Sequence, residues 1–185
     1  MSEKSPVAPF THRKAVLADV AQIRPLMDAA IAGLLAPYLP PDGVKASFDI
    51  MGLDTQLIAD GTYLAVEANG RIIGCGGWSR RATLFGGDHT AGRDAALLDP
   101  AVEPARVRAM YTHPDWTRRG VGRMILDLCE GEAAAEGFHS CELAATLAGE
   151  PLYLACGYVE VERFAAATST GVEVPLIRMR KSLSA

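Results

Sequence analysis

Hydrophobic side chains recur every three to four residues in several stretches of the chain, which is the spacing of one helix face. The clearest pattern covers residues 20–34, and a second one covers 121–129. Residues 44–57 follow the same period more weakly, after a break at 40–43, and predict either one helix or two short ones. The chain is therefore predicted to pack amphipathic helices against a hydrophobic core.

Other stretches are rich in β-branched and aromatic residues and are bounded by turn-forming residues, which is typical of strands. Two of them flank Asn69-Gly70 and predict a hairpin. Because a helix connects the fourth strand to the fifth, these two strands should be parallel. With a short helix at 151–156, the pattern predicts an α/β fold with a mixed sheet of roughly six to seven strands. The predicted strands are 12–16, 62–67, 71–78, 106–112, 140–145, 158–164 and 172–179.

Length sets the expected domain organisation. A chain of 185 residues is the size of one domain and can bury a substantial core. We assign residues 13–181 to that domain and residues 1–12 to a flexible N-terminus. Residues 86–103 show little periodicity and predict a long loop, which is either a functional lid or a mobile segment.

Composition narrows the classes of function. Hydrophobic residues make up 49% of the chain, which excludes a disordered protein. The net charge is −4 and the arginines are spread along the chain, so we expect no nucleic-acid partner. No apolar run approaches the roughly 20 residues of a membrane span, and the polar start lacks the apolar core of a signal peptide. We therefore expect a cytoplasmic protein that does not bind membranes.

The cysteines indicate packing rather than chemistry. They are widely spaced, with no C-x-x-C pair and no histidine at ligand spacing, so we expect neither a metal site nor a disulfide framework. Buried cysteine behaves as a small hydrophobic residue. We place all of them in the core: Cys75, Cys129, Cys141 and Cys156.

The most informative stretch joins the fourth strand to the helix at 121–129. It contains Arg118, Arg119, Gly120, Gly122 and Arg123. The start of a helix carries backbone N–H groups that have no partner within the helix. Glycine lets phosphate groups reach these N–H groups, and the helix dipole favours the negative charge. The stretch predicts a pyrophosphate-binding turn; the alternative is a tight turn with solvated arginines.

Two common phosphate-binding patterns do not fit this turn. The dinucleotide pattern G-x-G-x-x-G requires glycine where Ile125 stands, and a Walker loop requires lysine after Gly122. The segment Thr117-Arg118-Arg119-Gly120-Val121-Gly122 instead resembles the R/Q-x-x-G-x-G/A pattern by which GNAT acetyltransferases bind acyl-coenzyme A. Thr117 is the one departure from that pattern.

A second segment, Glu150 to Tyr158, resembles the closing motif of the same family. In that motif a short helix carries Leu/Phe-Tyr and ends at Gly-Phe/Tyr, and Gly157 fits the position just past a helix end. The asparagine that precedes this helix in the family is absent, because the region reads Thr146-Leu147-Ala148-Gly149.

The resemblance implies a single GNAT-type domain in which the fourth and fifth strands splay apart. Acetyl-CoA would bind as co-substrate with its pantetheine arm in the gap, and no metal is required. The residues expected to bind it are Met110, Tyr111 and Thr112 in the strand, Arg118, Arg119, Gly120, Val121, Gly122 and Arg123 in the turn, and Thr146.

The resemblance also places the hydroxyl of Tyr153 beside the coenzyme A sulfur, where it would protonate the departing thiolate as the catalytic acid. The alternative is a tyrosine ring packed in the core. The general base stays open: Glu103, His113 and Glu142 are nearby in sequence, and a water chain would need no dedicated residue.

The implied function is that of an acyltransferase. It would move an acetyl group from acetyl-CoA to a primary amine of a small molecule, an amino acid or a peptide by direct attack in a ternary complex. One alternative is a non-catalytic acyl-CoA-binding regulatory domain on the same fold, and another is a non-enzymatic interaction protein.

The resemblance further implies an acceptor pocket between the first two helices, the loop after the third strand and the final hairpin. Carboxylates there would suit a cationic amine, or they could be solvated loop residues: Asp42, Asp49, Asp54, Asp88, Asp94 and Asp99. Dimers are common in the family. The strand from Val172 could pair with a second copy in a homodimer or could be left bare.

Overall fold

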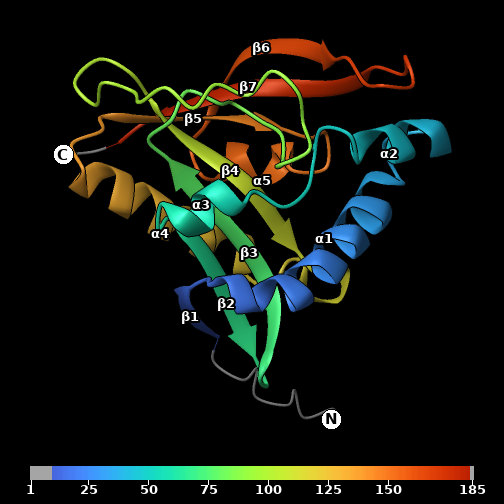
Figure 1. Ribbon diagram of the computed structural model, residues 1–185, viewed down its shortest axis with the longest axis horizontal. Helices are drawn as coiled ribbons and strands as arrows, with labels where there is room; N and C mark the ends of the chain where they lie inside the picture. The colour runs from blue at the N-terminus through green and yellow to red at the C-terminus, as the bar shows by residue number, and fades with distance from the viewer. Residues whose placement is uncertain (1–9, 184–185) are drawn as a thin grey trace.

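The computed structural model describes residues 10–183 and shows one mixed sheet with helices on both faces (Figure 1). The sheet has seven strands in the order β1-β2-β3-β4-β5-β7-β6. All neighbours are antiparallel except β4 and β5, which are parallel as the helical connection predicts. The strands are β1 (Thr11–Lys14), β2 (Tyr63–Ala68), β3 (Arg71–Ser79), β4 (Ala105–Thr112), β5 (Ser140–Ala145), β6 (Val159–Ala166) and β7 (Val174–Ser182).

The helices divide between the two faces of the sheet (Figure 1). One face is covered by α1 (Val20–Leu35), α2 (Pro41–Ser47) and α3 (Thr55–Ala59), and the other by α4 (Val121–Ala135) and α5 (Glu150–Ala155). The weak helical pattern at 44–57 thus forms two short helices. The predicted break at 40–43 does not extend to residue 43, because α2 already begins at Pro41. Proline fits the first turn of a helix, where its missing N–H needs no partner.

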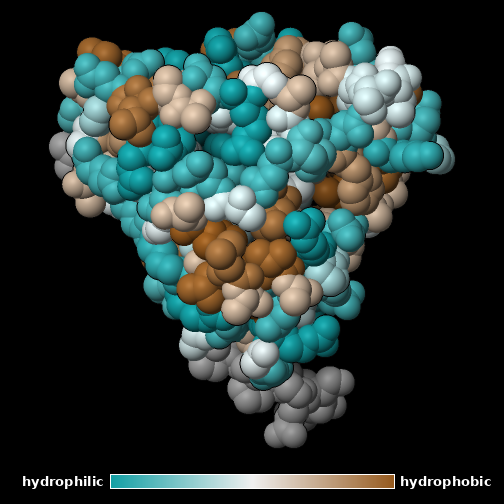
Figure 2. All heavy atoms as spheres, in the orientation of Figure 1, coloured by the Kyte–Doolittle hydropathy of each residue, from teal (hydrophilic) through white to brown (hydrophobic). Residues whose placement is uncertain are grey.

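Each face of the sheet has its own hydrophobic core. On the α4 face the core forms around Trp78, Ile125 and Leu143, and on the α1 face around Ile23 and Tyr63. Figure 2 shows hydrophobic side chains gathered in the middle of the α1 face, between α3 and the first turns of α1, with hydrophilic residues around them. The four cysteines are buried and free, as predicted.

Strand β3 has glycine where its neighbours approach most closely. A Cβ at Gly74 would lie 2.4 Å from Cγ1 of Val121, the first residue of α4. A Cβ at Gly76 would lie 2.4 Å from Sδ of Met110 on β4. Since real Cβ atoms do not tolerate such distances, these glycines allow both α4 and β4 to pack against β3.

Strand β4 carries a bulge opposite Gly76. Between its pairs with Gly77 and Cys75, β4 advances by one residue more than β3. Ala109 lies at this point with a φ of 51°, and its carbonyl accepts a hydrogen bond of 2.9 Å from the hydroxyl of Tyr63. The bulge redirects β4 just before its C-terminal end.

Strands β4 and β5 pair only at their beginnings. The register contains Ala105 with Cys141 and Arg106 with Glu142. Beyond these pairs β4 continues along β3, while β5 stays paired with β7 along its whole length. The separation implied by the family resemblance is therefore present, and it opens a gap between the two strands.

The segment between β3 and β4 is irregular but anchored. Arg93 Nη2 donates to Asp54 at 2.8 Å, and the hydroxyl of Thr90 donates to the carbonyl of Asp49 at 2.9 Å. Leu98 is buried in the core of the α4 face. These contacts hold the predicted long loop against the segment that joins α2 to α3.

Two predicted features change. Within the proposed flexible N-terminus, residues 1–9 lie outside the described part of the chain, but Thr11 and His12 pair with β2. The strand that follows Val172 does not form an edge, because β7 lies between β5 and β6. After β6 the chain turns back, and β7 pairs between β5 and β6. The edge strand on this side of the sheet is therefore β6.

Candidate functional site

One cavity of about 750 Å³ occupies the gap between β4 and β5. On one side its walls come from the start of α4 and from α5, and we call this the α4 end. On the other side they come from the end of α1, residues 50–52, residues 84–86 and Leu176 of β7, and we call this the α1 end. Residues 107–112 of β4 line the cavity between the two ends.

The α4 end presents a run of backbone N–H groups. The N–H groups of residues 118–123 donate to no acceptor within residues 10–183, and the first helical bond is from the N–H of Met124 to the carbonyl of Gly120 at 2.9 Å. Such groups at a helix start carry partial positive charge. The turn therefore has the geometry of an anion-binding site.

The two glycines of this turn have different tasks. Gly120 has a φ of +90° and no atom within 4 Å of the position a Cβ would take. Glycine adopts this conformation without strain, and the space above it is open. A Cβ at Gly122 would lie 2.8 Å from Cδ2 of Leu152. Gly120 thus shapes the turn, and Gly122 allows α4 and α5 to meet.

Two of the three predicted arginines lie at the cavity. Arg118 and Arg123 line it, and Arg123 Nη2 donates to the carbonyl of Ala155 at 3.3 Å. Arg119 does not line it. Its guanidinium lies 4.8 Å from the centroid of the Trp116 ring, in a cation–π contact with a residue that does line the cavity.

Tyr153 lies on α5 and lines the cavity, with only 8% of the residue exposed and its ring packed in the core of the α4 face, 5.8 Å from the ring centroid of Tyr158. Burial raises the pKa of its hydroxyl above the usual value, so the hydroxyl stays protonated at neutral pH. A Cβ at Gly149 would lie 3.0 Å from Cε2 of Tyr153, so this glycine leaves room for the ring. Thr146, which also lines the cavity, accepts a 3.1 Å hydrogen bond from the N–H of Gly149 and shapes the turn before α5.

The predicted residues of β4 line the middle of the cavity. These are Met110, Tyr111 and Thr112, and Ala109 at the bulge lines the cavity as well. The hydroxyl of Tyr111 accepts a 2.8 Å hydrogen bond from the N–H of Gly52. Ala109 was not predicted as a site residue, because a bulge depends on pairing between strands. The only local signal for it is the glycine-rich stretch of β3.

The α1 end is hydrophobic, and Arg108 is its one charged residue. Arg108 is 5% exposed; its Nη1 lies 2.6 Å from Oδ2 of Asp54, and its Nη2 donates to the carbonyl of Gly86. Arg108 was also not predicted. Its neighbours in the wall are Leu34, Leu35, Tyr38, Ile50, Met51, Leu84, Phe85 and Leu176.

None of the three candidate bases lines the cavity. The carboxylate of Glu142 lies 2.6 Å from both Arg106 Nη1 and Arg180 Nη2. Glu103 and His113 accept hydrogen bonds from loop N–H groups. Asp, Glu and His are all absent from the described cavity wall.

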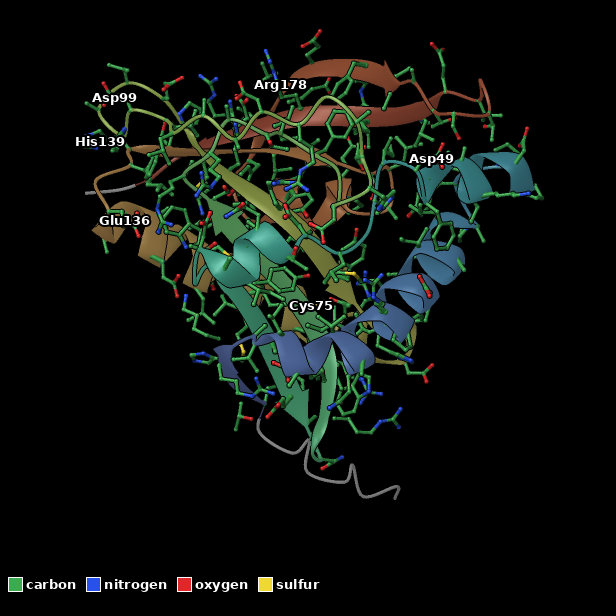
Figure 3. All side chains as sticks on the ribbon, in the orientation of Figure 1. Asp49, Cys75, Asp99, Glu136, His139 and Arg178 are labelled. Carbon is green, nitrogen blue, oxygen red and sulfur yellow. The ribbon has the colours of Figure 1, made fainter. Side chains whose placement is uncertain are left out.

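The acidic residues expected at the acceptor pocket also lie elsewhere. Asp54 pairs with Arg108, and Asp49 accepts hydrogen bonds from the N–H and the hydroxyl of Ser169 at 2.7 and 2.5 Å. Figure 3 shows Asp49 beside α2 and Asp99 at the opposite side of the molecule. The remaining three accept hydrogen bonds from backbone N–H groups of α2, α3 and the segment between β3 and β4: Asp42, Asp88 and Asp94.

Two further observations concern residues 10–183. No group of three or more His, Cys, Asp or Glu side chains there is arranged to hold a metal ion. None of the helices in this part of the chain combines the length and hydropathy needed to cross a membrane.

Comparison with protein families gives a match to the acetyltransferase (GNAT) domain over residues 59–160, which is more than half of the chain. This range includes β2 to β5, α4 and α5, and therefore the whole α4 end of the cavity. No curated protein matches the chain.

Several solved structures share the fold. A GCN5-related N-acetyltransferase from Rhodopseudomonas palustris has a TM-score of 0.70 at 20% identity, covering 97% of this chain and 99% of the other. A putative acetyltransferase from Salmonella typhimurium with its cofactor acetyl-CoA has a TM-score of 0.62 at 20% identity, covering 95% and 94%. An N-acetyltransferase from Thermoplasma acidophilum in complex with coenzyme A has a TM-score of 0.62 at 12% identity, covering 94% and 99%.

Proposed function

The chain belongs to the GNAT acetyltransferase family, and on that premise we propose that it transfers an acetyl group from acetyl-CoA to a primary amine. The acceptor is the amine of a small molecule, an amino acid or a peptide, and it attacks directly in a ternary complex. The single observation that carries this proposal is the run of N–H groups at residues 118–123, which opens into the same cavity as Tyr153.

The α4 end fits the diphosphate of coenzyme A. The N–H groups of residues 118–123 would donate to its oxygens, and Arg118 and Arg123 would add charge-assisted hydrogen bonds. The open space above Gly120 supports this assignment, because a ligand can approach the backbone there. The structural neighbours from Salmonella typhimurium and Thermoplasma acidophilum, which hold acetyl-CoA and coenzyme A, support the same choice of ligand.

The gap between β4 and β5 fits the pantetheine arm. Residues 110–112 are free of β5 on that side, so their backbone groups can pair with the amides of the arm as a strand would. This pairing would place the thioester near the bulge at Ala109. Backbone N–H groups of β4 would then stabilise the negative charge that develops on the thioester oxygen.

Tyr153 would act as the catalytic acid. Its hydroxyl carries a proton at neutral pH because burial raises its pKa, and it would give this proton to the thiolate sulfur as the C–S bond breaks. The incoming amine must lose a proton to become a nucleophile. Since the described wall holds no carboxylate or imidazole, this proton would leave through water.

The same lack of a base in the wall favours one alternative, a regulatory domain that binds acyl-CoA without turnover. The experiment that separates the two measures thiol release from acetyl-CoA across a library of primary amines, together with acetyl-CoA affinity by calorimetry. The proposal expects amine-dependent release with acetylated amine as product. Binding without release from any amine would favour the regulatory domain, and absence of binding would contradict both.

A further inference from the structure

We infer that the acceptor is an apolar monoamine whose only cationic group is the reacting nitrogen, and that polyamines and other polycations are rejected. This inference rests on the proposed function, because it assigns the α1 end of the cavity to the acceptor. It is carried by the hydrophobic wall at that end, whose described residues include no carboxylate and only one charged side chain, that of Arg108.

The α1 end offers hydrophobic contacts from four separate parts of the chain. Leu35 is the last residue of α1, and Met51 lies between α2 and α3. Phe85 lies in the segment between β3 and β4, and Leu176 lies in β7. Leu35 and Leu176 are each 3% exposed, so they form the floor of a preformed apolar site rather than a solvated rim. Such a site gains from burying the hydrocarbon part of an acceptor.

The only charge in this wall is positive. Arg108 pairs with Asp54, and Asp54 also accepts from Arg93 at 2.8 Å. The carboxylate of Asp54 is fully buried, and Arg93 also lies 3.4 Å from Asp88, so the two arginines are balanced by two aspartates that do not line the cavity. Arg108 Nε is buried and has no hydrogen-bond partner within residues 10–183.

A second ammonium group would therefore lack a counter-ion at the α1 end. The other titratable groups that face the cavity are Tyr38, Tyr111 and Tyr153, with Arg118 and Arg123 at the α4 end, and none of these is anionic at neutral pH. Transfer of an ammonium from water into apolar surroundings is unfavourable unless it is paired. For a diamine, this desolvation free energy would weaken binding, because the nitrogen that does not react stays charged.

The same wall helps to explain how the reacting amine becomes neutral without a dedicated base. Apolar surroundings disfavour the ammonium form relative to the free amine, and the described wall has no carboxylate to stabilise that form. An amine that enters the α1 end is thus shifted toward the form that can attack the thioester. The proton leaves to water before the C–N bond forms.

The direct test compares 1-aminopentane with 1,5-diaminopentane, which differ only in the second amino group. We expect kcat/KM for acetyl transfer to be at least about 30-fold higher for the monoamine. Equal or faster turnover of the diamine would overturn the inference while leaving the proposed function intact. Binding of both amines to the protein saturated with coenzyme A is measured in parallel by calorimetry, so that the preference can be read without turnover.

A pair of variants checks that the missing carboxylate is the cause. Met51 is partly exposed, so it can be replaced by a polar residue. Met51→Glu should reduce the monoamine preference at least about tenfold, in turnover or in binding, whereas Met51→Gln should not. An unchanged preference in Met51→Glu would contradict the inference. A monoamine preference in binding without turnover of any amine would support the inference about the site and contradict the proposed function.

Discussion

The α4 end and the α1 end of the cavity offer opposite chemistry to a ligand. The α4 end presents backbone N–H groups and two arginines, whereas the α1 end presents hydrophobic side chains and one buried arginine. The first suits a polyanion that remains hydrated on one side, and the second suits an apolar group that leaves water. Under the proposed function, electrostatic attraction would select the donor at the α4 end, and burial of apolar surface would select the acceptor at the α1 end.

The two ends also differ in how they are built. The α4 end comes from one continuous part of the chain, from β4 through α5. The α1 end is formed by α1, the α2–α3 connection, the segment between β3 and β4, and β7. A change at the α4 end therefore acts on one turn, whereas a change at the α1 end depends on how several distant segments pack.

The largest expected effect concerns the chemical step, which the proposed function assigns to Tyr153 of α5. Tyr153→Phe removes the proposed acid, so kcat should fall by about 100-fold, the lower part of the range for general acid–base catalysis. The acetyl-CoA dissociation constant should stay within about twofold, because the ring remains to fill the same space. Stopped-flow thiol release and calorimetry measure the two quantities. Unchanged kcat would remove Tyr153 from the mechanism.

The next effect should be confined to the α4 end. Gly120→Val forces a β-branched residue into a φ of +90° and places side-chain atoms in the open space above the turn. We expect acetyl-CoA to bind at least about 30-fold more weakly, which corresponds to about 2 kcal/mol.

A matched control lies in the same helix. Gly131 of α4 is exposed, and no atom lies within 4 Å of the position its Cβ would take. Gly131→Ala should leave acetyl-CoA affinity unchanged and increase the free energy of unfolding by roughly 0.5–1 kcal/mol. Wild-type affinity in Gly120→Val would contradict the assignment of the turn to the diphosphate.

A smaller effect distinguishes the arginines of the turn. Arg118→Ala should weaken acetyl-CoA binding by about fivefold, since it removes a charge that lines the cavity. Arg119→Ala should change it by less than about twofold, because Arg119 stacks on Trp116 and does not itself line the cavity. The reverse order in a calorimetric comparison would mean that Arg119 leaves the Trp116 ring when the donor binds.

The smallest expected effect is the absence of a decline at alkaline pH. Because burial raises the pKa of Tyr153, the acid form persists as the pH rises from about 7 to about 10, the ordinary tyrosine value. Turnover should therefore not fall in this window, and it should rise wherever the acceptor amine is still losing its proton. A fall centred near pH 8 or 9 would indicate that another group supplies the proton.

The sequence predicts the α4 end better than the α1 end for a physical reason. The glycine and arginine positions of the turn, and the tyrosine of the short helix, are local signals that depend on a few adjacent residues. Arg119 shows the limit of such signals, because its contact with Trp116, three residues earlier, depends on the conformation of the turn and not on the residue pattern alone. The class, the parallel pair and most helices follow from periodicity.

The α1 end depends on long-range packing that periodicity does not describe. The acidic residues expected there form ion pairs or hold loops, and the group that does face the cavity is Arg108, which reads as an ordinary strand arginine. The bulge at Ala109 requires the alignment of β3 with β4. The position of β7 between β5 and β6 is likewise a matter of strand order, which the alternation of hydrophobic residues does not determine.

The glycines of β3 have a consequence for the reaction coordinate. Gly74 sets how closely the first residue of α4 approaches the sheet, and Gly76 does the same for the bulge of β4. Under the proposed function, one strand would thus set the separation between the turn that binds the diphosphate and the bulge beside the thioester carbon. Bond formation requires reacting atoms within about 3–3.5 Å of each other. A methyl group added at Gly74 or Gly76 would displace α4 or the bulge, and it would therefore change the distance between the amine nitrogen and the thioester carbon.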